Sequence, residues 1–343
     1  MMSGPSRLSG ALVASILFLL DILSCATLRG VVEYHQALQA YKNHQYGVAE
    51  GLLGSTLRQN PGDERAISLL GWIQFKQGRV EEAGKLFAEA DRINPENIMT
   101  VEGLAWVQYA FGQDEKAERS FNKLIQYAEK HFMNPDWLYY ERNDREIIQS
   151  VYSEGCFGLG LIAKRRGEWE EARTFLEKAS TQPNRFIDRD TIAKELADIL
   201  FQLGDYKAAA IFYKELTSQN PLNPLLLNRY AWCLYQSGDH VGAKSVFLRS
   251  KELSSRAEEF DQDLFSSQNV AQRLRAKRIA EPYYGLALIY IEERQFDAAE
   301  EELASALKIS PYFHHPYEIS LILAQYPEWQ ERLRLKSLGR SLP

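Results

Sequence analysis

Residues 64–97 read ERAISLLGWIQFKQGRVEEAGKLFAEADRINPEN, and this stretch decides the fold. Apolar residues approximate helical spacing in its first half, Gly78 interrupts the pattern, and helical spacing resumes from Val80. The second half ends at Asn94 and Pro95, a combination that stops helices. The stretch therefore predicts two helices joined by a short turn.

The same arrangement recurs seven times along the chain. Each copy has a small residue, an alanine twelve positions later and a large apolar residue four positions after the alanine. We name these the first small place, the alanine place and the large place. The alanines are spaced by 34, 34, 55, 37, 34 and 56 residues, so two links carry an insertion, and a period of this size is typical of a helical-repeat solenoid. The three places are occupied by Ala37, Ala49 and Leu53; Gly71, Ala83 and Phe87; Ala105, Ala117 and Phe121; Gly160, Ala172 and Leu176; Ala197, Ala209 and Tyr213; Ala231, Ala243 and Phe247; and Ala287, Ala299 and Leu303.

The small residues have a packing reason, because two antiparallel helices approach closely only where their side chains are short. Five copies place a glycine at the turn between the two helices, and the first and last copies place His44 and Arg294 there. The turn glycines are Gly78, Gly112, Gly167, Gly204 and Gly238.

Together these features resemble the tetratricopeptide repeat over roughly residues 30 to 313. The resemblance implies an all-α superhelical solenoid of about seven helix-turn-helix repeats, ended by a capping helix and forming one elongated domain. The expected order is repeats 1–3 in residues 30–131, a helical insertion in 132–152, repeats 4–6 in 153–257, an insertion in 258–279, repeat 7 in 280–313 and a C-terminal cap in 314–343.

Each insertion follows a set of three repeats. The first contains the helix-start signal Asn134-Pro135-Asp136, so it either adds a helix or lengthens the helix that follows. The arrangement is compatible with duplication of a three-repeat block, which one sequence does not establish.

Composition and motifs argue against several functions. The net charge of -6 argues against nucleic acid as a partner, because nucleic acid requires a clustered basic face. The three cysteines form no C-x-x-C motif or Cys/His cluster, so we expect no metal site and no cofactor. The glycines of residues 155–160 fall inside a predicted repeat helix rather than after a strand, and they do not indicate a phosphate loop. No catalytic residues are predicted, and the chain is not expected to be an enzyme.

Residues 1–25 do not follow the repeat pattern and have the features of a signal peptide. Arg7 precedes an apolar run over residues 11–20, and Ile22-Leu23-Ser24-Cys25 resembles a lipobox, which implies lipidation of Cys25. An uncleaved anchor and a plainly secreted form are the alternatives. If Cys25 is lipidated, Ala26 after it resembles the signal by which enterobacteria sort lipoproteins to the outer membrane, and this resemblance implies an outer-membrane lipoprotein facing the periplasm, with inner-membrane anchoring as the alternative.

The family resemblance also implies where a ligand binds, because the first helix of each repeat lines the concave face. A surface rich in tryptophan and tyrosine suits apolar peptide anchors or the faces of sugar rings. Alternatively, these bulky residues pack on neighbouring helices and tighten the solenoid. The residues carried over are Tyr34, Tyr41, Trp72, Phe75, Trp106, Tyr109, Phe157, Phe201, Trp232, Tyr235 and Tyr284.

The sequence thus predicts a scaffold or assembly factor anchored in the cell envelope through its N-terminal lipid. The expected partner is a protein of a secretion, pilus or outer-membrane assembly machine. The alternative is an accessory lipoprotein of polysaccharide export that binds the exported sugar polymer.

Overall fold

The computed structural model describes residues 30–134, 141–183, 187–258, 270–310 and residue 327. All regular secondary structure within these residues is α-helical. The predicted signal peptide with Cys25 lies outside the described residues, as does the predicted cap 314–343 apart from residue 327.

The chain divides into two compact units, Met1–Ile192 and Ala193–Pro343. The border falls inside α9 (Arg189–Gln202), at the link where the alanine spacing is 37 rather than 34 residues. Each unit is therefore described by itself.

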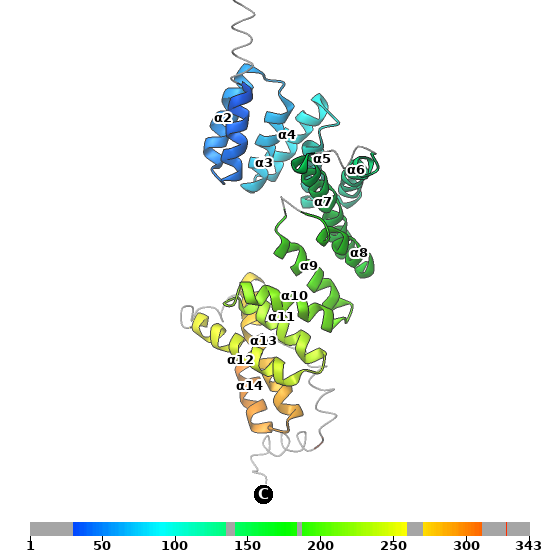
Figure 1. Cartoon of the computed structure of the whole chain (residues 1–343). Helices are drawn as coiled ribbons and strands as arrows, with labels where there is room; N and C mark the ends of the chain where they lie inside the picture. The colour runs from blue at the N-terminus through cyan, green and yellow to red at the C-terminus, as the bar shows by residue number, and fades with distance from the viewer. Residues whose placement is uncertain (1–29, 135–140, 184–186, 259–269, 311–326, 328–343) are drawn as a thin grey trace, which may run out of the picture. The chain divides into compact units, whose positions relative to one another are not determined.

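Both units are built from helix pairs that follow the predicted repeats (Figure 1). Unit 1 contains a helix over residues 30–42, followed by α2 (Tyr46–Gln59), α3 (Glu64–Lys76), α4 (Val80–Ile93), α5 (Ile98–Ala110), α6 (Asp114–Phe132), α7 (Arg142–Arg166) and α8 (Trp169–Ser180). Unit 2 contains α9, most of which lies beyond the border, then α10 (Tyr206–Gln219), α11 (Pro224–Gln236), α12 (His240–Glu258), α13 (Val270–Glu292) and α14 (Phe296–Ile309).

The helices on either side of each insertion are long, and those that follow the insertions, α7 and α13, contain many of the inserted residues. α6 has 19 residues and α7 has 25, whereas α3 and α5 have 13 each. In unit 2, α12 and α13 are likewise extended, to 19 and 23 residues. Of the two possibilities left open for the first insertion, the structure thus shows a longer following helix, which begins at Arg142.

The turn inside every repeat uses the left-handed backbone conformation. All five turn glycines have φ between 69° and 87°. His44 and Arg294 take the same conformation, with φ of 58° and 60°, although a Cβ makes it costly. The seven turns are therefore equivalent in backbone geometry despite the two substitutions.

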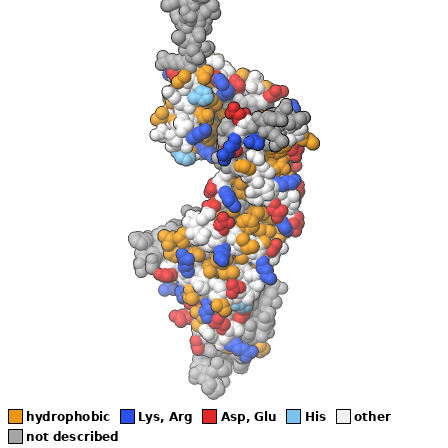
Figure 2. All heavy atoms as spheres, in the orientation of Figure 1, with side chains coloured by type: hydrophobic (Ala, Val, Ile, Leu, Met, Phe, Trp, Pro, Cys, Tyr) orange, Lys and Arg blue, Asp and Glu red, His pale blue; other side chains and the backbone are white. Residues whose placement is uncertain are grey.

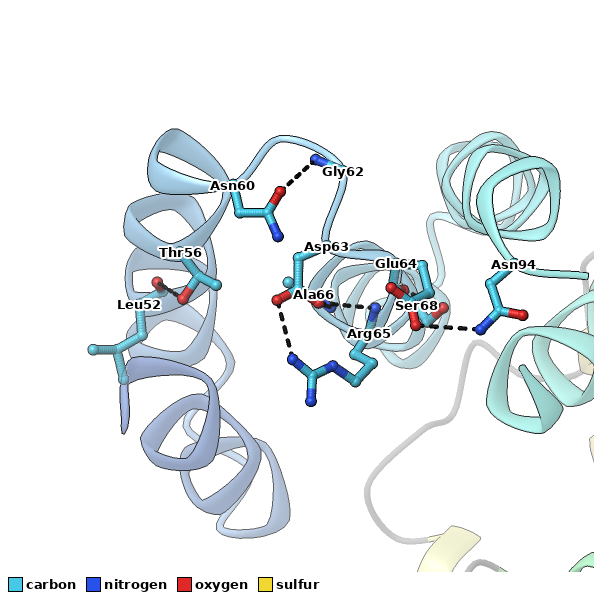
Figure 3. A network of polar contacts seen from close by, with 10 residues as sticks. All are labelled: Leu52, Thr56, Asn60, Gly62, Asp63, Glu64, Arg65, Ala66, Ser68 and Asn94. Carbon is cyan, nitrogen blue, oxygen red and sulfur yellow. Dashed lines mark hydrogen bonds and ion pairs between the residues drawn. The ribbon is translucent and has the colours of Figure 1, made fainter. Parts of the chain in front are cut away.

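Helix starts are fixed by side-chain caps after the closing prolines. The Asp63 carboxylate accepts hydrogen bonds from the backbone N–H groups of Arg65 and Ala66, at 3.1 and 3.2 Å (Figure 3). The Asn94 amide then ties the end of α4 to the start of α3 by donating to Glu64 at 3.3 Å. Asn97 and Asn223 cap α5 and α11 in the same way as Asp63 caps α3.

The core runs along the repeats at the places that the sequence pattern identified. All seven residues at the alanine place are fully buried, and so are six of the seven at the large place. Leu303 in the last repeat is half-buried. Within each unit, α4 packs on both α3 and α5, and α12 packs on both α11 and α13, so that every such second helix is shared by two repeats.

Candidate functional site

The predicted groove residues fall into three groups by their place in the repeat. Three lie three positions before the first small place and are buried: Tyr34, Phe157 and Tyr284. Three lie one position after it, which we name the tryptophan set: Trp72, Trp106 and Trp232. Five lie four positions after it, which we name the aromatic set: Tyr41, Phe75, Tyr109, Phe201 and Tyr235.

Each member of the tryptophan set packs edge-on against the phenylalanine at the large place of its own repeat. The ring centroids lie 5.5 Å apart for Trp72 and Phe87, with the planes at 72°. The corresponding distances are 5.0 Å for Trp106 with Phe121 and 5.1 Å for Trp232 with Phe247. This edge-to-face geometry is favourable for aromatic pairs.

The same tryptophans also reach the next repeat through their indole N–H groups. Trp72 donates to the backbone carbonyl of Met99 at 3.2 Å, and Trp106 donates to the carboxylate of Glu154 at 3.4 Å. In unit 2, Trp232 donates to Glu281 at 2.9 Å. All three acceptor residues stand six positions before the first small place of their repeat. The tryptophan set thus makes packing contacts both within its own repeat and with the next one.

A close approach between repeats accompanies every phenylalanine at the large place. A Cβ at Gly103 would lie 2.3 Å from the ring of Phe87. The equivalent distances to Phe121 and Phe247 are 2.4 Å at Gly158 and Gly285. Sequence reasoning missed these glycines, yet they follow a readable rule: each stands two positions before the first small place of the repeat after a phenylalanine.

All five residues of the aromatic set are half-buried, as are Trp106 and Trp232, whereas Trp72 and the three residues before the first small place are buried. Three members of the aromatic set lean edge-on against their tryptophans, with centroid distances of 5.8 Å for Phe75, 6.0 Å for Tyr109 and 5.7 Å for Tyr235. The tryptophan set therefore packs against three of the five members of the aromatic set, whereas Tyr41 packs against Tyr46 and Phe201 against Tyr206.

Side chains of the protein already cover part of these rings. The Arg165 guanidinium lies 3.9 Å from the centroid of the Tyr109 ring, and Arg229 lies 5.6 Å from that of Phe201. The imidazole of His240 is stacked on Tyr235 at 5.0 Å, and the Tyr235 hydroxyl donates to Glu292 at 2.7 Å. A ligand at these residues would meet ring edges beside polar groups.

The junctions between repeats 3 and 4 and between repeats 6 and 7 have the same construction. Trp106 lies 6.1 Å from Phe157 with the rings at 48°, and Trp232 lies 6.2 Å from Tyr284 with the rings at 46°. Both junctions follow an insertion. The two units therefore contain one matched aromatic arrangement each.

Metal-ligand clusters and membrane-spanning helices are both absent from the described residues. Within that part of the chain, no cluster of three or more His, Cys, Asp or Glu side chains is arranged to hold a metal ion. No helix there is long and apolar enough to cross a membrane. Gly155 and Gly160 lie inside α7, where the repeat register had placed them. In Figure 2, acidic and basic side chains are interspersed over the visible face.

Family models described as tetratricopeptide repeat match residues 34–98, 154–178, 194–258 and 280–313. No curated protein matches the sequence.

Two solved structures illustrate the likeness in fold. One is pilF of Pseudomonas aeruginosa, at a TM-score of 0.51 and 18% identity, covering 66% of this chain and 93% of that one. The other is the C-terminal part of a repeat-containing protein from Cytophaga hutchinsonii, at a TM-score of 0.50 and 13% identity, covering 81% and 96%. At such low identity the likeness concerns the fold alone. With family models matching more than half of its residues, the chain belongs to the tetratricopeptide repeat family.

Proposed function

We propose that this tetratricopeptide repeat protein is a non-enzymatic scaffold that binds a polypeptide through the aromatic set. Repeats of this kind generally serve protein interaction, and stacked repeats offer an extended surface to a partner. The observation that carries the proposal is the recurrence of a half-buried aromatic side chain at one place in five of the seven repeats.

The contacts of the aromatic set with the tryptophan set favour a role in binding. Phe75, Tyr109 and Tyr235 each lean on a tryptophan that is itself hydrogen-bonded to the next repeat. Side chains held in one position lose little conformational freedom when a partner binds, so more of the contact energy appears as affinity. Aromatic side chains of this kind are frequent hot spots.

The surroundings of the aromatic set favour a polypeptide over an exported polysaccharide. Sugar rings stack on open aromatic faces, but Arg165 and His240 occupy faces of Tyr109 and Tyr235. A peptide can use ring edges together with the neighbouring charged groups. Exported polysaccharide remains the alternative outcome of the test below.

The test compares single alanine variants at Tyr109 and Tyr235 with Phe111→Ala. Phe111 is 48% exposed and lies outside the aromatic set, which makes it a matched control. The species that the wild type binds from a host envelope extract should be digested by protease. Each Tyr variant should bind it more weakly by about 2 kcal/mol of binding free energy. Unchanged binding in both Tyr variants, or a bound species resistant to protease and sensitive to glycosidase, would contradict the proposal.

We further propose that the scaffold is held in the cell envelope by a lipid on Cys25, on the periplasmic side of the outer membrane, with inner-membrane anchoring as the alternative. The proposal rests on the apolar run of residues 11–20 and on Ile22-Leu23-Ser24-Cys25. A partner in a secretion, pilus or outer-membrane assembly machine fits this placement. Fatty-acid labelling in the host tests it: the wild type should be labelled and Cys25→Ser should not. An unlabelled wild type recovered free of membranes would exclude the anchor.

A further inference from the structure

Two carboxyl groups meet inside unit 1, where α5 and α7 pack together. Glu102 of α5 is 5% exposed and Glu154 of α7 is 1% exposed, and Glu154 reaches α5 at Trp106, one helical turn from Glu102. Among the described residues, no N–H or hydroxyl group donates to Oε1 of Glu154. Two charged carboxylates so placed would repel each other without the water that normally solvates them.

The neighbouring elements supply little compensating charge. Lys76 of α3 lowers the pKa of both groups, but burial outweighs it and raises both, that of Glu102 well above its usual range. Tyr41 faces the pair from the helix over residues 30–42, and the two carboxyls add to the burial that raises its pKa. The second helices α4, α6 and α8 present apolar side chains to α5 and α7: Phe87, Phe121 and Leu176.

The proton belongs on Glu102 rather than on Glu154. The Trp106 indole N–H donates to Oε2 of Glu154, and this bond stabilises the charged form of that carboxylate. A protonated Glu102 then serves as a hydrogen-bond donor to Glu154.

The matched junction in unit 2 has an amide where unit 1 has the carboxyl of Glu102, so its contact needs no titratable proton. Asn228 occupies the place of Glu102, three positions before the first small place, and Glu281 occupies the place of Glu154. The amide of Asn228 donates to Oε2 of Glu281 at 3.4 Å and to the carbonyl of Arg278 at 3.1 Å, while Ser250 donates to the Asn228 oxygen at 2.6 Å. A neutral amide therefore makes the contact that Glu102 makes only in its protonated form.

We propose that a single proton held between Glu102 and Glu154 closes the contact between α5 and α7, so that the junction of repeats 3 and 4 loosens as the pH rises. The α11–α13 junction, closed by Asn228, does not respond. This regulation goes beyond the proposed binding function, and it acts beneath Trp106, which supports Tyr109 of the aromatic set.

The direction in which stability changes with pH follows from proton linkage. Above the ordinary glutamate pKa the unfolded chain releases this proton, whereas the folded protein keeps it until its own raised pKa. In that window the native state binds more protons than the unfolded state, so stability falls with rising pH. One proton corresponds to a change of up to about tenfold in the unfolding equilibrium constant per pH unit.

The test measures denaturant unfolding of the full chain from pH 5 to pH 8.5, in the wild type and in Glu102→Gln. The glutamine keeps the shape of the side chain, and its amide donates a hydrogen bond without needing a titratable proton. The unfolding equilibrium constant of the wild type should rise by up to about tenfold per pH unit, and this rise should be absent in the variant. Parallel profiles for the two proteins would overturn the proposal. If Glu102→Gln does not fold, Glu154→Gln serves instead, because its amide can accept from Trp106 and donate to Glu102.

A second variant makes the reverse change in unit 2. Asn228→Asp introduces a carboxyl beside Glu281 and should add a second fall of stability with rising pH to the one that the wild type shows. Hydrogen exchange, corrected for its intrinsic pH dependence, should show loss of protection with rising pH in residues 98–110 and 142–166 of the wild type. Loss of protection spread evenly over both units would also overturn the proposal.

Discussion

The ring of Phe87 occupies the space where any side chain at Gly103 would stand, since a Cβ there would lie 2.3 Å from ring carbons. A Cβ at Gly71, within the same repeat, would likewise lie 2.8 Å from this ring. Phe87 is therefore enclosed by two helices that belong to successive repeats. Because the contact crosses the boundary between repeats, it sets how closely repeat 3 packs on repeat 2.

Replacing Gly103 with alanine should destabilise unit 1. The added methyl group must push the Phe87 ring or the helices apart, which costs about 1–3 kcal/mol of unfolding free energy. Denaturant unfolding measures the loss. Gly51→Ala is the matched control, because its Cβ meets nothing within 4 Å and alanine in a helix is favoured over glycine by about 0.5–1 kcal/mol.

A second substitution distinguishes a steric clash from an effect of glycine itself. Leu53 stands at the large place of repeat 1, and Leu69 of repeat 2 stands at the position that corresponds to Gly103, so leucine at the large place tolerates a side chain opposite. Phe87→Leu should therefore reduce the cost of Gly103→Ala, with a coupling of about 0.5–3 kcal/mol between the two sites. Strict additivity would show that the ring does not cause the penalty.

Sequence reasoning recovered the repeat register because that register is local. The small residue, the alanine and the large residue lie within one helix pair, and the left-handed turn at Gly78 is encoded by the residue that adopts it. The outcome at His44 and Arg294 was also predictable, since the period assigns them the turn position.

The arrangement of the aromatic residues depended on contacts between repeats, and periodicity does not specify those. Trp106 and Tyr109 are three residues apart on one helix and both are half-buried, yet Trp106 donates to Glu154 across an insertion whereas Tyr109 lies against Arg165. The buried Glu102 likewise finds its partner 52 residues away. The border between the two units was not predictable, because the sequence there contains no glycine-rich or proline-rich linker.

His44→Gly should stabilise the first repeat. His44 adopts φ of 58°, which costs a residue with a Cβ about 1–2 kcal/mol, and glycine removes that cost while adding freedom to the unfolded chain. The net expectation is a gain of about 0.5–1 kcal/mol in denaturant unfolding. Gly238→Ala makes the opposite change at the equivalent turn of repeat 6, where φ is 87°, and should destabilise by a similar amount. A loss of stability in His44→Gly would mean that the contact of His44 with Tyr46 at 3.1 Å outweighs the backbone strain.

The buried cysteines should be unreactive in the folded protein. Burial raises the pKa of Cys156 to about 11 and that of Cys233 to about 12. The thiolate is the reactive form, and at pH 7.5 it is less than about one part in a thousand for such groups. In a Cys25→Ser chain, which retains these two thiols, iodoacetamide should modify neither residue in buffer and both in urea. Reaction should appear only as the pH approaches 11, and rapid labelling at neutral pH would show that α7 or α11 opens readily.

Substitutions at Trp232 test whether the tryptophan set packs the repeats or binds the ligand. Trp232→Ala removes ring contacts with Phe247 and Tyr284 and the hydrogen bond to Glu281, so it should cost about 3–5 kcal/mol of stability. Trp232→Phe keeps an aromatic ring but leaves Glu281 without the indole donor, which costs about 1–3 kcal/mol. Thermal unfolding beside the binding assay on Tyr235→Ala measures both effects. The packing role predicts that the Trp232 variants lose stability in this order and lose binding only in proportion to unfolding, whereas Tyr235→Ala loses binding with little change in stability. Selective loss of binding in Trp232→Phe at unchanged stability would instead place the indole in the ligand contact.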